Sequence, residues 1–269
     1  MGSVVMGSST TKARSTWRSV VLPTEHGAWG FLSEPILLGL LVAFSWAGVA
    51  LGVAAFGVFL AQQPLKIALK DRLRGKFYPR TKLAERFAAL FGALAVTGGV
   101  LALLSARQDF LTPLLIAVPL ALIQVDYAAR NQGRALIPEI SGAWALGASA
   151  TLIGLAGGLA APTAFLLWLI MAVRALISIV YVRVRLRRAR QESARIEGTL
   201  ILHVAAVFIF GALWTAGTVG IALPLAFGVL LARAAKGLIA PAAVPTKVIG
   251  FSELGFGGLV AILAAVAVG

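Results

Sequence analysis

The chain has 269 residues, of which 59% are hydrophobic and only 13% are charged. A soluble domain of this length would carry about 25% charged residues, so this composition and the mean hydropathy of +0.93 exclude an ordinary soluble protein. The sequence contains no cysteine, which excludes a disulfide partner, a thiolate nucleophile and a cysteine-ligated metal. The formal net charge is +14, so the chain is apolar and strongly basic at once.

Nine apolar segments recur along the chain, each near the length of about 20 residues that a helix needs to cross a bilayer. The first 20 residues are polar and contain no apolar stretch, so we expect a cytoplasmic tail there and not a signal peptide. The predicted fold is all-α: a polytopic membrane bundle of about nine transmembrane helices, with residues 21–269 as a single domain. The predicted segments are 27–44, 47–67, 86–105, 110–128, 137–158, 162–182, 199–215, 217–235 and 251–268.

Positive charge alternates between the predicted connections. Lys and Arg gather in the N-terminal tail and after the second, fourth, sixth and eighth segments, whereas the other connections carry only Arg107. Short loops rich in Lys and Arg stay in the cytoplasm, so we expect a plasma (inner) membrane protein with its N-terminus inside and its C-terminus outside. A basic surface can also bind nucleic acid, but topology and attraction to anionic lipid explain this one-sided pattern better. No nucleic-acid partner is expected.

The sixth segment carries an arginine, Arg174, well inside its apolar run. Charges at membrane depth are costly and usually face the bundle interior or a wet cavity. Two interpretations stay open: Arg174 belongs to a track for an anion such as phosphate, which Arg binds through its planar fork, or it pairs structurally with an acid on a neighbouring helix. Helical spacing places four residues on the same inward stripe: Arg174, Tyr181, Arg185 and Arg188.

The second segment ends in the polar stretch "AQQPLKIALKDRLR". Gln62, Lys66 and Lys70 lie one turn apart on one helix face, with Gln63 beside them. This pattern favours a wet cavity lined by Gln62, Gln63 and Lys66. Lysines at a helix end also snorkel to the interface, which is what we expect of Lys70.

Further candidate substrate-binding residues follow the fourth segment, in "QVDYAARNQGRALIPEISGA": Asp126, Asn131, Arg134 and Glu139. His203 lies about one turn inside the seventh segment. A histidine at such a position either contacts a ligand or is a hydrogen-bonded structural residue, and both interpretations remain open.

The first segment begins with "LPTEHGAWGFLSEP". A helix cap at Thr24 explains Glu25, whose charge is favourable at a helix N-terminus. It does not explain His26 and Glu34, which are eight residues apart and roughly share a face. We predict that both line a cytoplasm-facing cavity, and Glu and His are usual general bases, so they are the candidate catalytic residues.

Three of these stretches resemble a known family. "PTEHGAW", "RNQGRALIPEISG" and the basic "VRVRLRRAR" are similar to the YwiC-like family of bacterial membrane proteins. This resemblance implies a membrane protein and does not specify a reaction.

A more distant resemblance is to the UbiA superfamily of intramembrane prenyltransferases. It implies nine helices and an active cavity that opens to the cytoplasm, where two Asp-rich motifs bind Mg²⁺ and a prenyl diphosphate. The stretch "DRLRGKFYPRT" resembles the end of the first motif, with Asp71 matching one aspartate, but Ala68 and Gly75 stand where other aspartates are expected. The second motif holds arginines. Mg²⁺ needs carboxylate oxygens, so its usual ligands are missing and the cofactor stays unassigned, whereas Arg and Lys bind phosphate directly.

The leading hypothesis is a UbiA-like transferase that acts on an isoprenoid or another phosphorylated, anionic membrane lipid. In this hypothesis Lys66, Arg174 and Arg185 stabilise the leaving group electrostatically. The first alternative is a transporter or lipid carrier, although the sequence shows no obvious inverted repeat of the kind many transporters have. The second is a non-catalytic partner of a respiratory or quinone-linked complex, which nothing in the sequence excludes.

Overall fold

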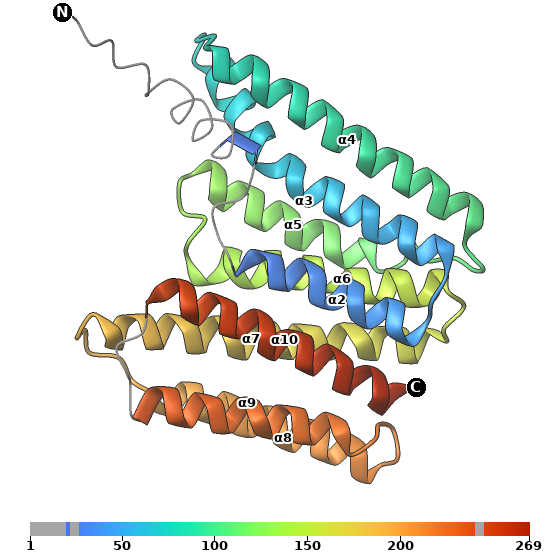
Figure 1. Ribbon diagram of the computed structural model, residues 1–269, viewed down its shortest axis with the longest axis vertical. Helices are drawn as coiled ribbons and strands as arrows, with labels where there is room; N and C mark the ends of the chain where they lie inside the picture. Colours follow the sequence, from blue (N-terminus) through green and yellow to red (C-terminus); the bar gives the residue numbers. More distant parts are fainter. Residues whose placement is uncertain (1–19, 22–26, 240–244) are drawn as a thin grey trace, which may run out of the picture.

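The computed structural model describes residues 20–21, 27–239 and 245–269. Over these ranges the chain is helical and contains no strand, and each helix coincides with one predicted segment (Figure 1). The all-α prediction is therefore confirmed. The helices are α2 (Ala28–Val42), α3 (Trp46–Leu73), α4 (Pro79–Ser105), α5 (Leu114–Ala129), α6 (Leu136–Ala156), α7 (Ala161–Ala189), α8 (Glu197–Thr215), α9 (Ala222–Ile239) and α10 (Thr246–Val268).

Seven of the described helices are long and apolar enough to cross a membrane, and α2 and α5 are shorter apolar helices of 15 and 16 residues. The helices α3, α4 and α7 have 28, 27 and 29 residues. At 1.5 Å per residue each is roughly 40 Å long, which exceeds a hydrocarbon core of about 30 Å. All three overrun their predicted segments on the polar side. The apolar run ends there, but Lys, Arg and Glu are good helix formers and the helix continues.

The helices form a flattened bundle in which sequence neighbours pair as hairpins. The α3–α4 hairpin lies at one edge and the α8–α9 hairpin at the other, with α2, α6, α7 and α10 between them (Figure 1). One apolar core joins α7 to α8, α9 and α10 and includes the stacked rings of Phe210 and Phe227. A second core joins α2, α3 and α6 around Leu32 and Ile153. The centre of the bundle is therefore where α2, α7 and α10 meet.

The α3–α4 hairpin depends on two glycines. A Cβ at Gly57 would lie 2.7 Å from the backbone nitrogen of Ala95, and a Cβ at Gly98 would lie 2.6 Å from the carbonyl oxygen of Ala50. Small residues allow such close backbone approach in lipid, where no hydrophobic force drives helices together.

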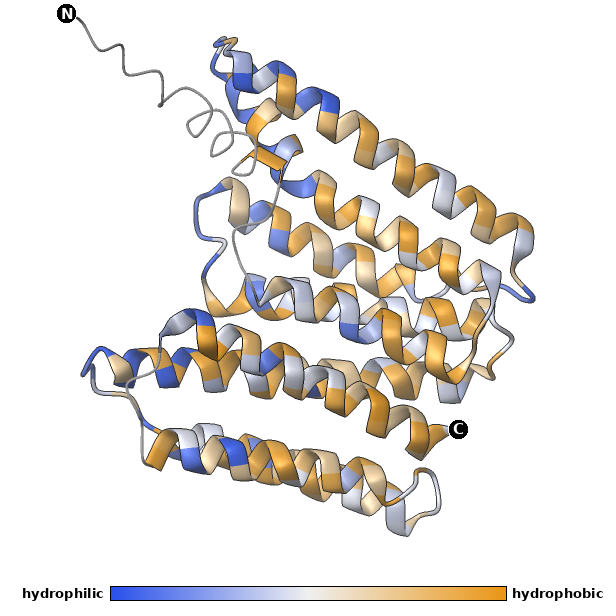
Figure 2. Ribbon diagram, in the orientation of Figure 1, coloured by the Kyte–Doolittle hydropathy of each residue, from blue (hydrophilic) through white to orange (hydrophobic). Residues whose placement is uncertain are grey.

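Hydrophilic residues gather at one end of the bundle, where α3 meets α4, α5 meets α6 and α7 meets α8 (Figure 2). We call this the basic end, because those connections carry the Lys and Arg clusters of the sequence. Arg107 lies at the opposite end and donates a hydrogen bond to the carbonyl of Gly157. The described connections that are rich in Lys and Arg thus lie at one end of the bundle, as the alternation of charge predicts. That this end faces the cytoplasm stays a prediction.

Candidate functional site

Four charged side chains from four different helices are buried together at the centre of the bundle. Glu34 of α2 and Arg174 of α7 form an ion pair with 2.9 Å between Oε1 and Nη2, and each side chain is only 3% exposed. Arg233 of α9 forms an ion pair with Glu253 of α10, and these side chains are 9% exposed. We call these four residues the charge cluster. Glu34, Arg233 and Glu253 lie six or seven residues from the basic ends of their helices, which corresponds to a depth of roughly 10 Å.

Glu253 connects the two ion pairs. Arg174 donates a 2.7 Å hydrogen bond from Nη2 to the backbone carbonyl of Glu253, and the hydroxyl of Ser178 donates to its carboxylate oxygen Oε2. The order Glu34, Arg174, Glu253, Arg233 alternates in sign and sums to zero. Buried charges at membrane depth persist only when they are paired in this way.

A glycine makes room for the cluster. Gly257 of α10 lies so close to Glu34 and Arg174 that a Cβ at this position would overlap the carboxylate and the guanidinium. Gly30 leaves similar space one turn from Glu34, since a Cβ there would lie 2.7 Å from Oε1. The glycines in α2 and α10 therefore permit the ion pair to sit between the two helices.

Aromatic rings cover the two arginines. The guanidinium carbon of Arg233 lies 4.0 Å from the ring centroid of Tyr181 and 5.3 Å from that of Phe256. The guanidinium carbon of Arg174 lies 5.5 Å from the centroid of Phe31. Cation–π attraction is strongest where the cation is shielded from water, so these rings hold the guanidinium groups in place.

The hydrogen bonding of the arginines is nevertheless incomplete. Among the described residues, Nε of Arg174 and both Nε and Nη2 of Arg233 are buried without an acceptor. Oε1 of Glu34 also lacks a hydrogen bond, because its contact with Arg174 has the distance of an ion pair but not the geometry of a hydrogen bond. A buried donor without an acceptor costs about 1–3 kcal/mol. The cluster thus presents three donor nitrogens that an additional anionic acceptor would satisfy.

Three further predicted residues adjoin the cluster. Tyr181 and Arg185 are buried on the same stripe of α7 as Arg174, at 4% and 9% exposure, as the helical spacing predicts. The ring of Tyr181 lies between Arg233 and the ring of His203, whose centroid is 6.3 Å away. Arg185 donates to the carbonyl of Gly237 near the end of α9.

His203 is fully buried on α8. Its Nδ1 lies 2.8 Å from the carbonyl oxygen of Thr199, and a carbonyl only accepts, so Nδ1 carries the proton. Nε2 has no hydrogen-bond partner among the described residues. One ring nitrogen therefore has the structural role that the sequence left open, and the other is buried without a hydrogen-bond partner among the described residues.

The other predicted residues lie outside the charge cluster, on α3 and around the α5–α6 connection. Gln62 and Lys66 are exposed on α3, and Gln63 is half-buried. Asn131 is exposed, lies just after the end of α5 and has a φ of 59°. Two acids form ion pairs near the basic end: Asp126 with Arg130 at 2.9 Å, and Glu139 with Arg183 at 2.7 Å. The guanidinium of Arg183 also donates to the carbonyl of exposed Arg134. His26 lies outside the described residues.

Asp71 joins α3 to the start of α4 through side-chain hydrogen bonds. Its carboxylate accepts hydrogen bonds from Nε and Nη2 of Arg80, at 3.2 and 3.0 Å, and from the hydroxyl of Thr81 at 2.8 Å. The residue is 3% exposed. Both oxygens of the one aspartate that matches the UbiA motif are thus used to hold α3 against α4.

Asp71→Asn is expected to destabilise the protein by about 1–3 kcal/mol, because an amide cannot accept both arms of the guanidinium and the Thr81 hydroxyl. Thermal unfolding in detergent measures this loss. Glu85→Gln is the matched control: Glu85 pairs with Arg72 across the same hairpin, but the pair is exposed, and such pairs contribute about 0–1 kcal/mol. Equal midpoints of thermal unfolding for Asp71→Asn and Glu85→Gln would contradict the role of Asp71 in holding α3 against α4.

The described residues do not fit Mg²⁺. A diphosphate-bound Mg²⁺ needs several carboxylate oxygens, and no group of three or more His, Cys, Asp or Glu in the described part of the chain is placed to hold a metal. Asp71 is already bonded to Arg80 and Thr81, and the second motif position is occupied by arginines. We therefore derive no step through a metal.

Two members of the cluster, Arg233 and Glu253, are not among the site residues predicted from the sequence. Both fall inside predicted membrane segments, 217–235 and 251–268, so the rule that singled out Arg174 could have found them. Gly257 carries no comparable signal, because its role depends on which side chains face it across the helix interface.

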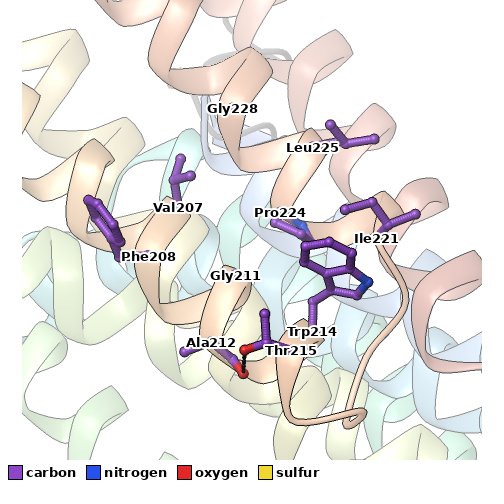
Figure 3. Close-up of a pocket in the computed structure, with 10 residues that line it drawn as sticks. All are labelled: Val207, Phe208, Gly211, Ala212, Trp214, Thr215, Ile221, Pro224, Leu225 and Gly228. Atoms are coloured by element: carbon purple, nitrogen blue, oxygen red, sulfur yellow. Dashed lines mark hydrogen bonds between the residues drawn. The ribbon is translucent and has the colours of Figure 1, made fainter.

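An apolar groove of about 560 Å³ lies between α8 and α9 (Figure 3). Its lining includes Phe208, Trp214 and Leu225, and its one hydroxyl, on Thr215, donates to the carbonyl of Ala212. The groove contains no charged side chain and shares no residue with the charge cluster. It has the chemistry of an ordinary contact with acyl chains or another helix.

Comparison with known proteins supports both resemblances. The family model for YwiC-like proteins matches residues 22–154, which confirms the predicted relationship over that part of the chain. No curated protein matches the sequence. A solved structure from work on digeranylgeranylglyceryl phosphate synthase in membranes, a UbiA-type prenyltransferase, has a TM-score of 0.60 and 15% identity, and the alignment covers 96% of this chain and 99% of that one. The UbiA-like fold is thus confirmed, and at this identity the likeness shows the fold alone.

Proposed function

We propose that this chain, which is YwiC-like over residues 22–154 and UbiA-like in fold, binds the phosphorylated head group of an isoprenoid or another anionic lipid at its charge cluster. The observation that supports this proposal is the surplus of buried N–H donors on Arg174 and Arg233. Arginine binds phosphate oxygens through two parallel hydrogen bonds, and no metal is needed for that contact.

The position of the cluster suits a lipid substrate. It lies roughly 10 Å inside the basic end, so a head group would enter from that end while its tail stayed among apolar helices. Arg185 lies about three turns from Arg174 toward the basic end, on the same buried stripe of α7, and would guide the anion inward. We place the basic end in the cytoplasm, since its loops hold the Lys and Arg clusters.

The reaction that fits this site is prenyl transfer. The C1–O bond of a prenyl diphosphate breaks, and the diphosphate leaves with the bonding electrons toward Arg174 and Arg233. A nucleophilic atom of an acceptor lipid forms the new bond to C1 and gives up its proton. Glu34 and His26 are our candidate bases for that proton, and the guanidinium groups stabilise the negative charge that develops on the leaving group.

The proposal is tested by diphosphate release from farnesyl and geranylgeranyl diphosphate by the purified protein in nanodiscs. Assays with Mg²⁺ and with EDTA run side by side. We expect release that survives EDTA and falls at least about 100-fold in Arg174→Ala, the scale of losing one preorganised donor. Arg187→Ala is the matched control, because Arg187 is an exposed arginine of the same helix.

Three outcomes separate the hypotheses. Release that needs Mg²⁺ would overturn the metal-free mechanism. An unchanged rate in both Arg174→Ala and His26→Ala would place the chemistry elsewhere. Binding of the lipid with no turnover for either chain length would refute the transferase hypothesis and favour a lipid carrier. The charge cluster, which links α2, α7, α9 and α10, is compatible with that function.

A further inference from the structure

Glu253 is the internal counter-ion of Arg233. Its carboxylate is bonded to the guanidinium of Arg233 on one side and to the hydroxyl of Ser178 on the other. We propose that a lipid anion binds by displacing this carboxylate from Arg233, and that Glu253 takes up one proton as it is released. This inference rests on the proposed function, because it concerns the same anion site.

The cluster holds two arginines and two glutamates and is neutral as it stands. An arriving phosphate would leave the buried site with net negative charge, which a low-dielectric interior penalises heavily. Arginine does not change protonation state in proteins. Within the cluster, only a carboxyl group can offset one of the added negative charges, by accepting a proton.

Ser178 distinguishes Glu253 from Glu34. A serine hydroxyl both donates and accepts, so Ser178 can donate to the Glu253 carboxylate and, by rotating, accept from the protonated carboxyl. Glu34 has no hydroxyl bonded to it among the described residues and is enclosed by Gly30, Gly257 and Arg174. A protonated Glu253 would therefore keep a hydrogen bond to Ser178, whereas no described hydroxyl offers one to Glu34.

The charge balance includes all described titratable and charged groups that face this site. They come from each element that packs against it: Glu34 on α2, Arg174, Tyr181 and Arg185 on α7, His203 on α8, Arg233 on α9 and Glu253 on α10. Besides Glu253 and Glu34, the group with an unbonded basic atom is His203, through Nε2. The experiment must therefore separate Glu253 from Glu34 and His203.

The test is equilibrium binding of farnesyl diphosphate to the protein in nanodiscs with EDTA, over about pH 5.5 to pH 8.5. If one proton is taken up per bound anion, the apparent Kd rises about tenfold per pH unit over the range in which Glu253 of the unliganded protein is ionised. We expect this slope in the wild type and its loss in Glu253→Gln, which also binds more tightly at high pH. Titration of the probe itself affects both proteins equally and cancels in their difference. Glu85→Gln, which removes an exposed carboxylate, should keep the wild-type slope.

Each other outcome overturns a defined part of the inference. A wild-type slope in Glu253→Gln refutes proton uptake by Glu253 while leaving the anion site intact. A slope that disappears in His203→Asn and persists in Glu253→Gln assigns the proton to His203. Failure of both the wild type and Glu253→Gln to bind at any pH refutes the proposed function itself. Should Glu253→Gln not fold, Ser178→Ala serves instead, and it must narrow the pH range over which binding weakens, because it loses both the donor to the carboxylate and the acceptor for the protonated carboxyl.

Discussion

Arg174→Met is expected to destabilise the protein by about 3–5 kcal/mol, which is the loss seen when one partner of a buried ion pair is removed. The substitution leaves Glu34 buried without a cation and removes the hydrogen bond to the backbone of Glu253. Methionine keeps most of the volume and flexibility of the arginine stem, so the loss reports charge more than packing. Thermal or denaturant-induced unfolding of the purified proteins in detergent measures the difference in the free energy of unfolding between the variant and the wild type.

The double variant Arg174→Met/Glu34→Gln separates pairing from function. Because both charges are gone, we expect it to recover much of the lost stability, as apolar replacements of buried pairs commonly do. It should still fail to bind farnesyl diphosphate. Arg187→Met, on an exposed arginine of the same helix, controls for the loss of one positive charge. A double variant that is as unstable as the single one, or one that binds the probe normally, would contradict this account.

Gly257→Ala carries the second largest expected effect. The new Cβ overlaps the Glu34 carboxylate and the Arg174 guanidinium, so α10 must move away from α2 or the ion pair must rearrange. Overpacking of a tight site typically costs about 1–3 kcal/mol, and the altered pair adds to that loss. We expect a lower unfolding midpoint and weaker binding of farnesyl diphosphate.

Gly258→Ala is the matched control for this variant. A Cβ at Gly258 has no heavy atom within 4 Å, and alanine is about 1 kcal/mol better than glycine in a helix. The control should therefore be as stable as the wild type or more stable. If both alanine variants rise in stability, the close contact at Gly257 is not a constraint on the bundle.

Much of the fold could be predicted from the sequence, because nine apolar runs of near-spanning length leave few alternatives. The helix ends were less predictable. The helix α7 continues to Ala189, about two turns past the predicted segment, because arginines that are too polar for the hydrocarbon core still form helix. Helical spacing also identified the buried stripe of Arg174, Tyr181 and Arg185.

The site was harder to predict, because it depends on which helices meet. Spacing could place Arg174 on an inward face, but only the packing shows that Glu34 is its partner and that Glu253 joins it to Arg233. The resemblance of Asp71 to one aspartate of the UbiA motif made it a candidate substrate-binding residue, whereas its carboxylate is bonded to Arg80 and Thr81. Gln62 and Lys66 share a face as predicted, but that face is exposed on α3.

The most direct test of the anion site is saturation binding of labelled farnesyl diphosphate in nanodiscs with EDTA. Three proteins are compared: the wild type, Arg233→Met/Glu253→Gln and Lys236→Met, whose lysine is exposed on α9 close to Arg233. The account predicts that the wild type and Lys236→Met bind alike, and that the double variant, which keeps the cluster neutral, loses binding at least about 100-fold, as expected for removal of charge-assisted bonds to phosphate. Equal binding by all three proteins would contradict it, because the lipid would then be held without the buried arginine.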